Sequence, residues 1–191
     1  MVFLTFKKKH INPLIERCKK NDSTAQMEVY NAYYKAMYNT SFRILKDTFE
    51  AEDIIQEAFL TAFTKLDSFK GEVTFGAWLK KIVVNKSLTQ LKKNHRYEEV
   101  KMEIVSNQEI EEIAIDFTSL NIKKVMDCLQ NLKDNYRIVL TLHLIEGYDY
   151  EEIAQILNYS NENVRTTISR AKKKLKQVLT TNTTKTQVYG R

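Results

Sequence analysis

The chain has 191 residues, of which 43% are hydrophobic, so it can bury the core of one domain or of two small ones. Four glycines and one proline supply few turn residues, which argues against a strand-and-turn architecture and predicts an all-α fold. The net charge of +6 favours a nucleic-acid partner, provided that the basic residues are clustered.

The first expected domain spans residues 22–96 and follows a basic, weakly patterned N-terminal segment, residues 1–21. Residues 21–46 predict one long helix, capped by Asp22 or Ser23, because inward-facing positions recur at helical spacing. These positions are Met27, Tyr30, Tyr34, Met37, Tyr38, Ser41 and Leu45. We interpret the tyrosines as core and boundary residues rather than as a platform for stacking bases.

A second helix is expected over residues 47–66, with one wide apolar face. That face comprises Ile54, Ile55, Ala58, Phe59, Ala62, Phe63 and Leu66. The opposite side is acidic and has no basic residue before Lys65; its acids are Asp47, Glu50, Glu52, Asp53 and Glu57. A solvated surface is the simple interpretation. The functional alternative is a docking face for a basic protein partner, formed by Asp53, Gln56 and Glu57.

Residues 67–74 break this pattern and predict a loop with exposed Phe69 and Lys70, in which Gly71 makes the turn and Thr74 caps the next helix. That helix, residues 75–96, has apolar positions at Phe75, Trp78, Leu79, Ile82, Val83, Leu88 and Leu91. Its charges are all basic: Lys80, Lys81, Lys86, Lys92, Lys93 and Arg96. Aromatic residues beside a basic loop and helix are typical of proteins that hold single-stranded DNA, although Trp78 by itself is interpreted as a core residue.

Residues 97–118 reverse the charge and predict a flexible acidic linker between two small helical domains. The acids are Glu98, Glu99, Glu103, Glu109, Glu111, Glu112 and Asp116. A second domain is expected over residues 119–179, and residues 180–191 form a polar tail expected to lack regular structure. The first two helices of this domain have their inward stripes at Ile122, Val125, Met126, Leu129, Leu132, Tyr136, Val139, Leu140, His143 and Leu144.

Residues 146–176 have the parts of a helix-turn-helix. The first helix, 150–157, has acids at its N-terminal end; Asn158 suits a left-handed C-cap, and Ser160 or Asn161 can cap the second helix. The second helix turns Val164, Ile168, Ala171 and Leu175 inward and Arg165, Arg170, Lys172, Lys173, Lys174 and Lys176 outward. These basic residues either solvate an outer face or contact DNA, and the acidic first helix beside a basic second one favours DNA.

Other classes of function find little support in the sequence. Cys18 and Cys128 lie far apart and form neither a metal-ligand pattern nor a disulfide framework, which suits a reducing cytoplasm. His10, His95 and His143 are isolated, and four glycines build no phosphate-binding loop. We therefore expect no enzyme, no metal, no cofactor and no small-molecule substrate. The sequence also has no signal peptide and no run of membrane-spanning length, so membrane insertion is not expected.

Over residues 22–178 the chain resembles the extracytoplasmic-function group of the sigma-70 family of bacterial RNA polymerase sigma factors. Residues 53–59 stand in the place of the family's acidic DxxQEAF helix. Residues 69–85 follow its FxGxxxFxxWLxxIxxN pattern, and residues 146–157 and 163–175 follow EGxxYxEIAxxL and TVRxxxxRAxxxL. Motifs from both expected domains, in the family's order, make the resemblance specific.

The sequence departs from the family pattern at two turns. Lys133 stands where the family usually has proline, and Asn158 where it often has glycine, which puts the turn geometry in question rather than DNA contact. The stretch between Arg96 and Ser119 leaves no room for the third domain of larger sigma factors.

The resemblance implies a cytoplasmic sigma factor that binds core RNA polymerase and promoter DNA and directs transcription initiation, and it leaves open an anti-sigma factor as a further partner. The residues implied to dock on the clamp helices of the largest polymerase subunit are Asp53, Gln56, Glu57 and Leu60. Those implied to capture the non-template strand of the −10 element are Phe69, Lys70, Phe75, Lys81, Asn85 and Lys86. Those implied to read the −35 element are Arg165, Thr166, Ser169, Arg170 and Lys173. The acidic linker would occupy the RNA exit path until the transcript displaces it.

The main alternative is a conventional helix-turn-helix transcriptional regulator in which residues 1–96 form a sensing or dimerising domain. Such a protein needs a ligand pocket or a symmetric interface. It would also leave the acidic face of residues 47–64 and the basic helix of residues 79–96 without a joint purpose.

Overall fold

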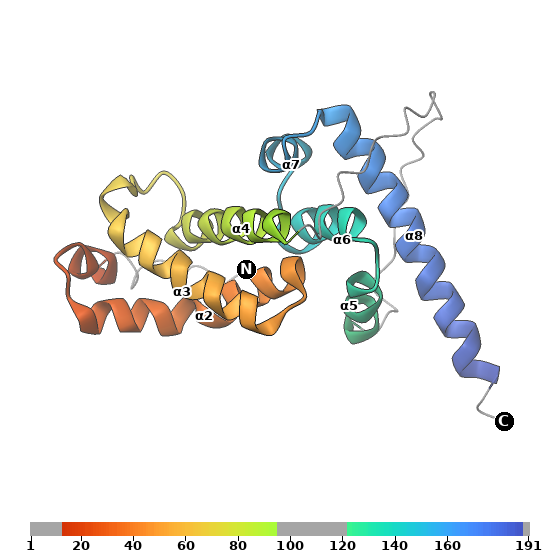
Figure 1. Cartoon of the computed structure of the whole chain (residues 1–191), viewed down its shortest axis with the longest axis horizontal. Coiled ribbons are helices and arrows are strands. Elements are labelled where there is room, and N and C mark those ends of the chain that lie inside the picture. Colours follow the sequence, from red (N-terminus) through yellow and green to blue (C-terminus); the bar gives the residue numbers. More distant parts are fainter. Residues whose placement is uncertain (1–12, 95–121, 189–191) are drawn as a thin grey trace. The chain divides into compact units, whose positions relative to one another are not determined.

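The computed structural model of the chain describes residues 13–94 and 122–188 (Figure 1). Every regular element of these residues is helical, which confirms the all-α prediction. The chain divides into two compact units, residues 1–93 and 94–191, each with its own core. The expected linker, residues 97–118, lies outside the described residues. Within the described part of the chain, no helix is both long and apolar enough to cross a membrane.

The first unit is built on three helices that all pack against one another: α2 (Ser23–Leu45), α3 (Thr48–Thr64) and α4 (Phe75–Lys93). A 3-10 turn, η1 (Leu66–Ser68), follows α3 and leads into the loop before α4. Because each helix contacts the other two, each has one buried face and one face left for solvent or for partners.

The starts of α2 and α3 are fixed by aspartates. The carboxylate of Asp22 accepts a hydrogen bond from the Ala25 amide at 3.1 Å, and that of Asp47 accepts one from the Glu50 amide at 3.0 Å. Of the two caps expected for α2, Asp22 is therefore the one used. Lys46 ends α2 with a left-handed φ of 61°, which turns the chain directly into α3.

The core of the first unit follows the predicted apolar face of α3. Its buried residues include Ile54, Ile55, Ala58, Phe59, Ala62 and Leu66. On α2 the inward face differs from the prediction, because Ala25 and Val29 are buried whereas Met27 is 59% exposed. The half-buried tyrosines of α2 lie along the core boundary, and the Tyr30 ring centroid is 4.7 Å from that of Phe59.

A short helix at residues 13–19 completes this core and was not predicted. It buries Ile15 and Cys18, each 2% exposed, against the inward residues of the other helices. Burial raises the pKa of the Cys18 thiol, so this sulfur stays protonated and behaves as a small apolar group. The helix is too short for its sequence to show a periodic pattern.

The second unit comprises α5 (Ile122–Gln130), α6 (Asp134–Leu140), the π-helical turn η2 (Thr141–Ile145), α7 (Tyr150–Leu157) and α8 (Asn161–Val188). The long helix α8 packs against α5, α6 and α7. Of the predicted inward residues, four are buried and four are half-buried, whereas Ile122 at the start of α5 is 79% exposed and Leu144 is 37% exposed. The buried ones are Leu129, Leu132, Val139 and Leu140, and the half-buried ones are Val125, Met126, Tyr136 and His143.

Asn158 and Ser160 cap the helices of the helix-turn-helix as predicted, and a capping box that was not predicted starts the first of them. Asp149 and Glu152 form a capping box at the start of α7, with hydrogen bonds of 2.8 and 2.9 Å to each other's backbone amides. Asn158 ends α7 in a left-handed conformation with φ of 58°. The Ser160 hydroxyl then accepts a hydrogen bond from the Asn163 amide at 3.2 Å and caps α8.

Both departures from the family pattern keep the turn geometry intact. Lys133 has φ of −57° and ψ of 148°, which a proline would also adopt, and Asn158 has the left-handed φ that glycine adopts most easily.

The tail beyond residue 179 departs from the prediction, because α8 continues through it to Val188. No glycine or proline interrupts the chain between Asn161 and Val188, so nothing in the sequence stops the helical hydrogen-bond ladder.

The left-handed turn at Asn158 gives a stability prediction. Asn158→Gly should keep or raise the free energy of unfolding of the second unit by up to about 1 kcal/mol, whereas Asn158→Val should lower it by about 1–2 kcal/mol, because valine is strained at positive φ. Calorimetry of the full chain measures both, with Gln155→Val on the exposed side of α7 as the control. A valine variant as stable as the wild type would show that the turn is not left-handed.

Candidate nucleic-acid interface and protein-docking face

The outer side of α3 presents the residues predicted to bind a protein partner. Asp53, Gln56, Glu57 and Leu60 are all exposed, and their spacing puts them on one face of the helix. Leu60 is 69% exposed although it is a large apolar residue. A single exposed leucine is common on protein surfaces, but this one lies on the same face as the predicted docking residues.

Phe49 extends this face and was missed by the sequence analysis. It is 79% exposed and lies one turn before Asp53, so apolar side chains flank the polar residues at both ends. The signal was present in the sequence, because Phe49 falls outside the buried stripe of α3. We call Phe49, Asp53, Gln56, Glu57 and Leu60 the α3 face.

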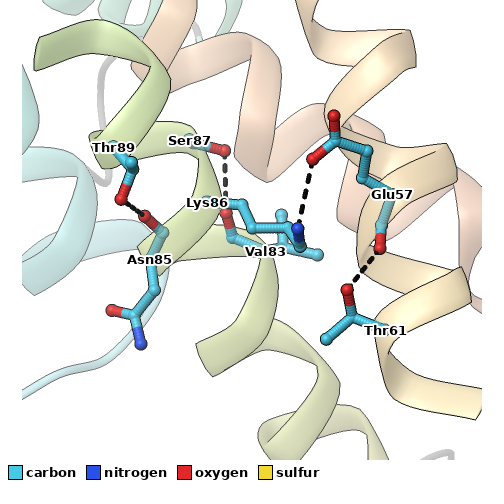
Figure 2. A network of polar contacts seen from close by, with 7 residues as sticks. All are labelled: Glu57, Thr61, Val83, Asn85, Lys86, Ser87 and Thr89. Carbon is cyan, nitrogen blue, oxygen red and sulfur yellow. Dashed lines mark hydrogen bonds and ion pairs between the residues drawn. The ribbon is translucent and has the colours of Figure 1, made fainter. Parts of the chain in front are cut away.

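One residue of the α3 face is paired with a residue of the predicted DNA site. The Glu57 Oε2 atom lies 3.1 Å from the Lys86 Nζ atom of α4, and Figure 2 shows the two side chains meeting between the helices. Their side chains are 63% and 28% exposed, so water screens the pair. This ion pair joins the acidic helix to the basic helix.

Asn85, which precedes Lys86 on α4, does not face α3. Figure 2 shows the Asn85 amide directed away from α3, while its backbone carbonyl accepts a 2.8 Å hydrogen bond from the Thr89 hydroxyl. Asn85 and Lys81 are exposed and lie one turn apart, so they share a surface. An amide for a base edge and a cation for a phosphate are thus presented together on α4.

An aromatic cluster of Phe69, Phe75 and Trp78 supports the loop before α4. The centroid of the Phe69 ring lies 5.7 Å from that of Phe75 and 5.4 Å from that of Trp78. Thr74 caps α4 as predicted, with its hydroxyl accepting a hydrogen bond from the Ala77 amide at 3.2 Å. Gly71 has φ of 78°, a value that favours glycine in this turn.

Two predictions about these aromatic residues are wrong. Phe75 is only 2% exposed and belongs to the core, so it has no surface to offer DNA and serves instead as the support for Phe69. Phe69 is half-buried rather than exposed, because its ring packs on Phe75 and Trp78. Lys70 is exposed as predicted.

The second helix of the helix-turn-helix, α8, separates its two faces as predicted. Val164, Ile168, Ala171 and Leu175 are each at most 1% exposed. Arg165, Arg170 and Lys173 are exposed. Thr166 and Ser169 are half-buried between the two faces. The five residues predicted to read duplex DNA therefore lie together along the outer and lateral surface of α8.

The sequence analysis also missed Tyr150, the first residue of α7. The centroid of its ring lies 5.8 Å from the Arg165 Cζ atom, so it contacts a predicted DNA-reading residue of the next helix. Nothing in the helical periodicity indicates a contact between side chains of two different helices.

The exposed groups of both units suit contact with nucleic acid. Among the described residues, no group of three or more histidine, cysteine, aspartate or glutamate side chains could hold a metal ion. The sites present cations, amides and hydroxyls over broad surfaces, which is how proteins contact nucleic-acid backbones and bases.

Comparison with known proteins finds a family match in each of the two units. The family model for sigma-70 region 2 matches residues 29–97, and the model for sigma-70 region 4 matches residues 122–175.

Two curated relatives come from Bacillus subtilis. The ECF RNA polymerase sigma factor SigW is 30% identical over 181 residues, which cover 88% of this chain and 96% of the relative. The RNA polymerase sigma factor YlaC is 30% identical over 159 residues, which cover 80% of this chain and 91% of the relative.

Two solved structures share the fold. The sigma factor RpoE of Bartonella quintana, in complex with the anti-sigma factor NepR, has a TM-score of 0.55 and 23% identity over 81% of this chain and 96% of that one. CnrH in complex with the cytosolic domain of CnrY has a TM-score of 0.52 and 21% identity over 88% of this chain and 96% of that one.

The burial of the aromatic cluster gives a second stability prediction. Phe75→Ala should lower the free energy of unfolding of the first unit by about 3–5 kcal/mol, because it leaves a cavity in the core. Phe69→Ala should cost only about 1 kcal/mol, because that ring is already partly exposed. Urea unfolding followed by circular dichroism measures both. Equal losses would contradict the different roles of the two rings.

Proposed function

This chain belongs to the extracytoplasmic-function group of the sigma-70 family, and we propose that it binds core RNA polymerase and directs promoter-specific initiation through the surfaces described above. The proposal rests on one observation, the combination of three surfaces in the same chain. One small unit has a polar docking face on α3 beside a basic, aromatic-supported surface on α4, and the same chain has a helix-turn-helix with exposed arginines. A conventional regulator requires only the last of these.

The proposed domain organisation follows the sequence. Residues 22–96 form the region 2-like domain, residues 119–179 the region 4-like domain, and residues 97–118 the linker between them, with 1–21 and 180–191 at the ends. The protein is regulatory rather than catalytic, so we propose no active site. We place it in the cytoplasm, because polymerase and promoter DNA are there.

The α3 face is the proposed docking site for core polymerase. Carboxylates give complementarity to a basic partner, whereas the exposed Phe49 and Leu60 provide apolar area that gains free energy when it is covered. The partner proposed for Asp53, Gln56, Glu57 and Leu60 is the pair of clamp helices of the largest subunit. An anti-sigma factor is a further proposed partner, since the related RpoE structure contains one.

Capture of the −10 element is assigned to the first unit. Lys70, Lys81 and Lys86 would contact phosphates, Asn85 a base edge, and the exposed side of Phe69 an unstacked base. Phe75 acts behind Phe69 and is not part of the proposed contact set.

Reading of the −35 element is assigned to α8. Arg165 and Arg170 are exposed near its N-terminal end, where a recognition helix meets base edges, and Lys173 follows one turn later toward the phosphates. Thr166 and Ser169 add short hydroxyl side chains on the same surface.

The α3 face can be tested by its affinity for core polymerase. Combining Asp53→Lys, Gln56→Ala and Leu60→Ala should weaken binding roughly 10- to 100-fold, since it removes an apolar anchor and reverses a charge in one interface. Glu28→Lys, an equal charge change on the exposed side of α2, should have little effect. An unchanged affinity for core polymerase at moderate salt would contradict the assignment of the α3 face to polymerase docking.

The ion pair between Glu57 and Lys86 predicts a reciprocal effect. In this proposal Glu57 must leave Lys86 before it can contact polymerase, and Lys86 must leave Glu57 before it can contact DNA. Lys86→Gln should therefore raise the affinity for core polymerase and weaken capture of the DNA strand. The gain in affinity should be at most about fivefold, because an exposed ion pair is worth about 0.2–1 kcal/mol. Lys81→Gln, one turn earlier on α4, should weaken strand capture and leave core affinity unchanged. A Lys86→Gln variant that binds core more weakly would contradict this coupling.

Opening of the duplex gives a third test. On duplex promoters, Phe69→Ala, Lys70→Ala and Asn85→Ala should each reduce run-off transcription, and on pre-melted templates they should partly recover, because an open strand spares the few kcal/mol needed to extract a base. Lys35→Ala on α2 is the control. Full activity of all three variants on both templates would show that the loop is only a connector.

A further inference from the structure

Three side chains of the second unit form a stack that ends at a proposed DNA-reading arginine. The ring centroids of His143 and Tyr150 lie 5.0 Å apart with an interplanar angle of 25°, and the Arg165 guanidinium carbon lies 5.8 Å from the Tyr150 centroid. The Nδ1 atom of His143 lies 3.1 Å from the Tyr148 carbonyl oxygen, within hydrogen-bonding distance. The stack therefore runs from η2 through α7 to α8.

The ring of Tyr150 is held in place without Arg165. It belongs to the first residue of α7, which lies between Asp149 and Glu152, the two residues of the capping box. The segment before it is fixed by a hydrogen bond from the Tyr148 amide to the Leu142 carbonyl, at 3.0 Å, and His143 covers the ring from η2. Tyr150 is thus a fixed platform, whereas Arg165 is a long, exposed side chain with many rotamers.

A cation over an aromatic face is attracted by the ring, and this contact favours the rotamers that keep the guanidinium at Tyr150. An arginine that reads a base must present its two nitrogens in one plane toward the groove. Restricting its rotamers before binding lowers the entropy lost when that geometry forms. The contact can therefore contribute to recognition and not only to folding.

We propose that Tyr150, backed by His143, is a positioning residue that sets the orientation of Arg165 and thereby the base preference at one position of the −35 element. The inference rests on the proposed function of α8. It assigns no DNA contact to Tyr150 itself, so the aromatic ring should matter and its hydroxyl should not.

The test uses core polymerase reconstituted with the full chain and a duplex library randomised over the −35 segment. Arg165→Ala should abolish the preference at one position. Tyr150→Leu should weaken the preference at that same position about two- to fivefold, the size of an exposed cation–π contact, and Tyr150→Phe should retain it. Tyr150→Leu should have no further effect in the Arg165→Ala background.

Matched measurements separate positioning from folding. Tyr159→Leu removes another half-buried tyrosine from the same helix-turn-helix and should leave the preference at that position unchanged. Thermal unfolding of each variant reports stability, and His143→Phe, which keeps a ring beneath Tyr150, should behave like the wild type.

The proposal is overturned if Tyr150→Leu lowers binding equally on all sequences, if Tyr150→Phe is as defective as Tyr150→Leu, or if the effects of Tyr150→Leu and Arg165→Ala simply add. If the proposed function itself is wrong, the wild-type complex would select no −35 sequence from the library.

Discussion

Burial of one face of every helix is the constraint on which this structure depends. Each unit is small, so α2, α3 and α4 can satisfy their apolar sides only by packing against one another, as α5, α6 and α7 do against α8. The same helical periodicity decides which face of each helix stays exposed. The α3 face, the Lys81 and Asn85 surface of α4, and the basic side of α8 are the faces that packing leaves free.

Charge distinguishes these faces, and we propose a different partner for each. In the first unit an acidic helix lies against a basic one, and the 3.1 Å pair of Glu57 and Lys86 marks the line where the two meet. Because that pair is partly exposed, it costs little to separate, which suits our proposal that polymerase contacts Glu57 and DNA contacts Lys86. In the second unit Asp149 and Glu152 cap the start of α7, and the cations of α8 share their helix with a single acidic residue, Glu162.

Helical periodicity predicted much of this from the sequence. It identified α3, α4, α7 and α8, the caps at Asp22, Thr74 and Ser160, and the inward residues Val164, Ile168, Ala171 and Leu175. It placed Phe75 among the apolar positions of its helix but could not show that this ring is fully buried while Phe69 is half-buried, because only packing decides how much of each ring stays exposed. The contact of Tyr150 with Arg165 and the helix at residues 13–19 depend on neighbours distant in sequence or on very short segments.

This single chain is proposed to give core polymerase the ability to choose promoters. The most direct measurement mixes purified core RNA polymerase with the full chain, transcribes a genomic DNA library in vitro and sequences the 5′ ends of the transcripts. We expect initiation at a limited set of sites that share two upstream elements at a fixed spacing. Core polymerase alone should use none of these sites. Binding of the chain to duplex DNA without retention on core polymerase, and with no new start sites, would contradict this proposal.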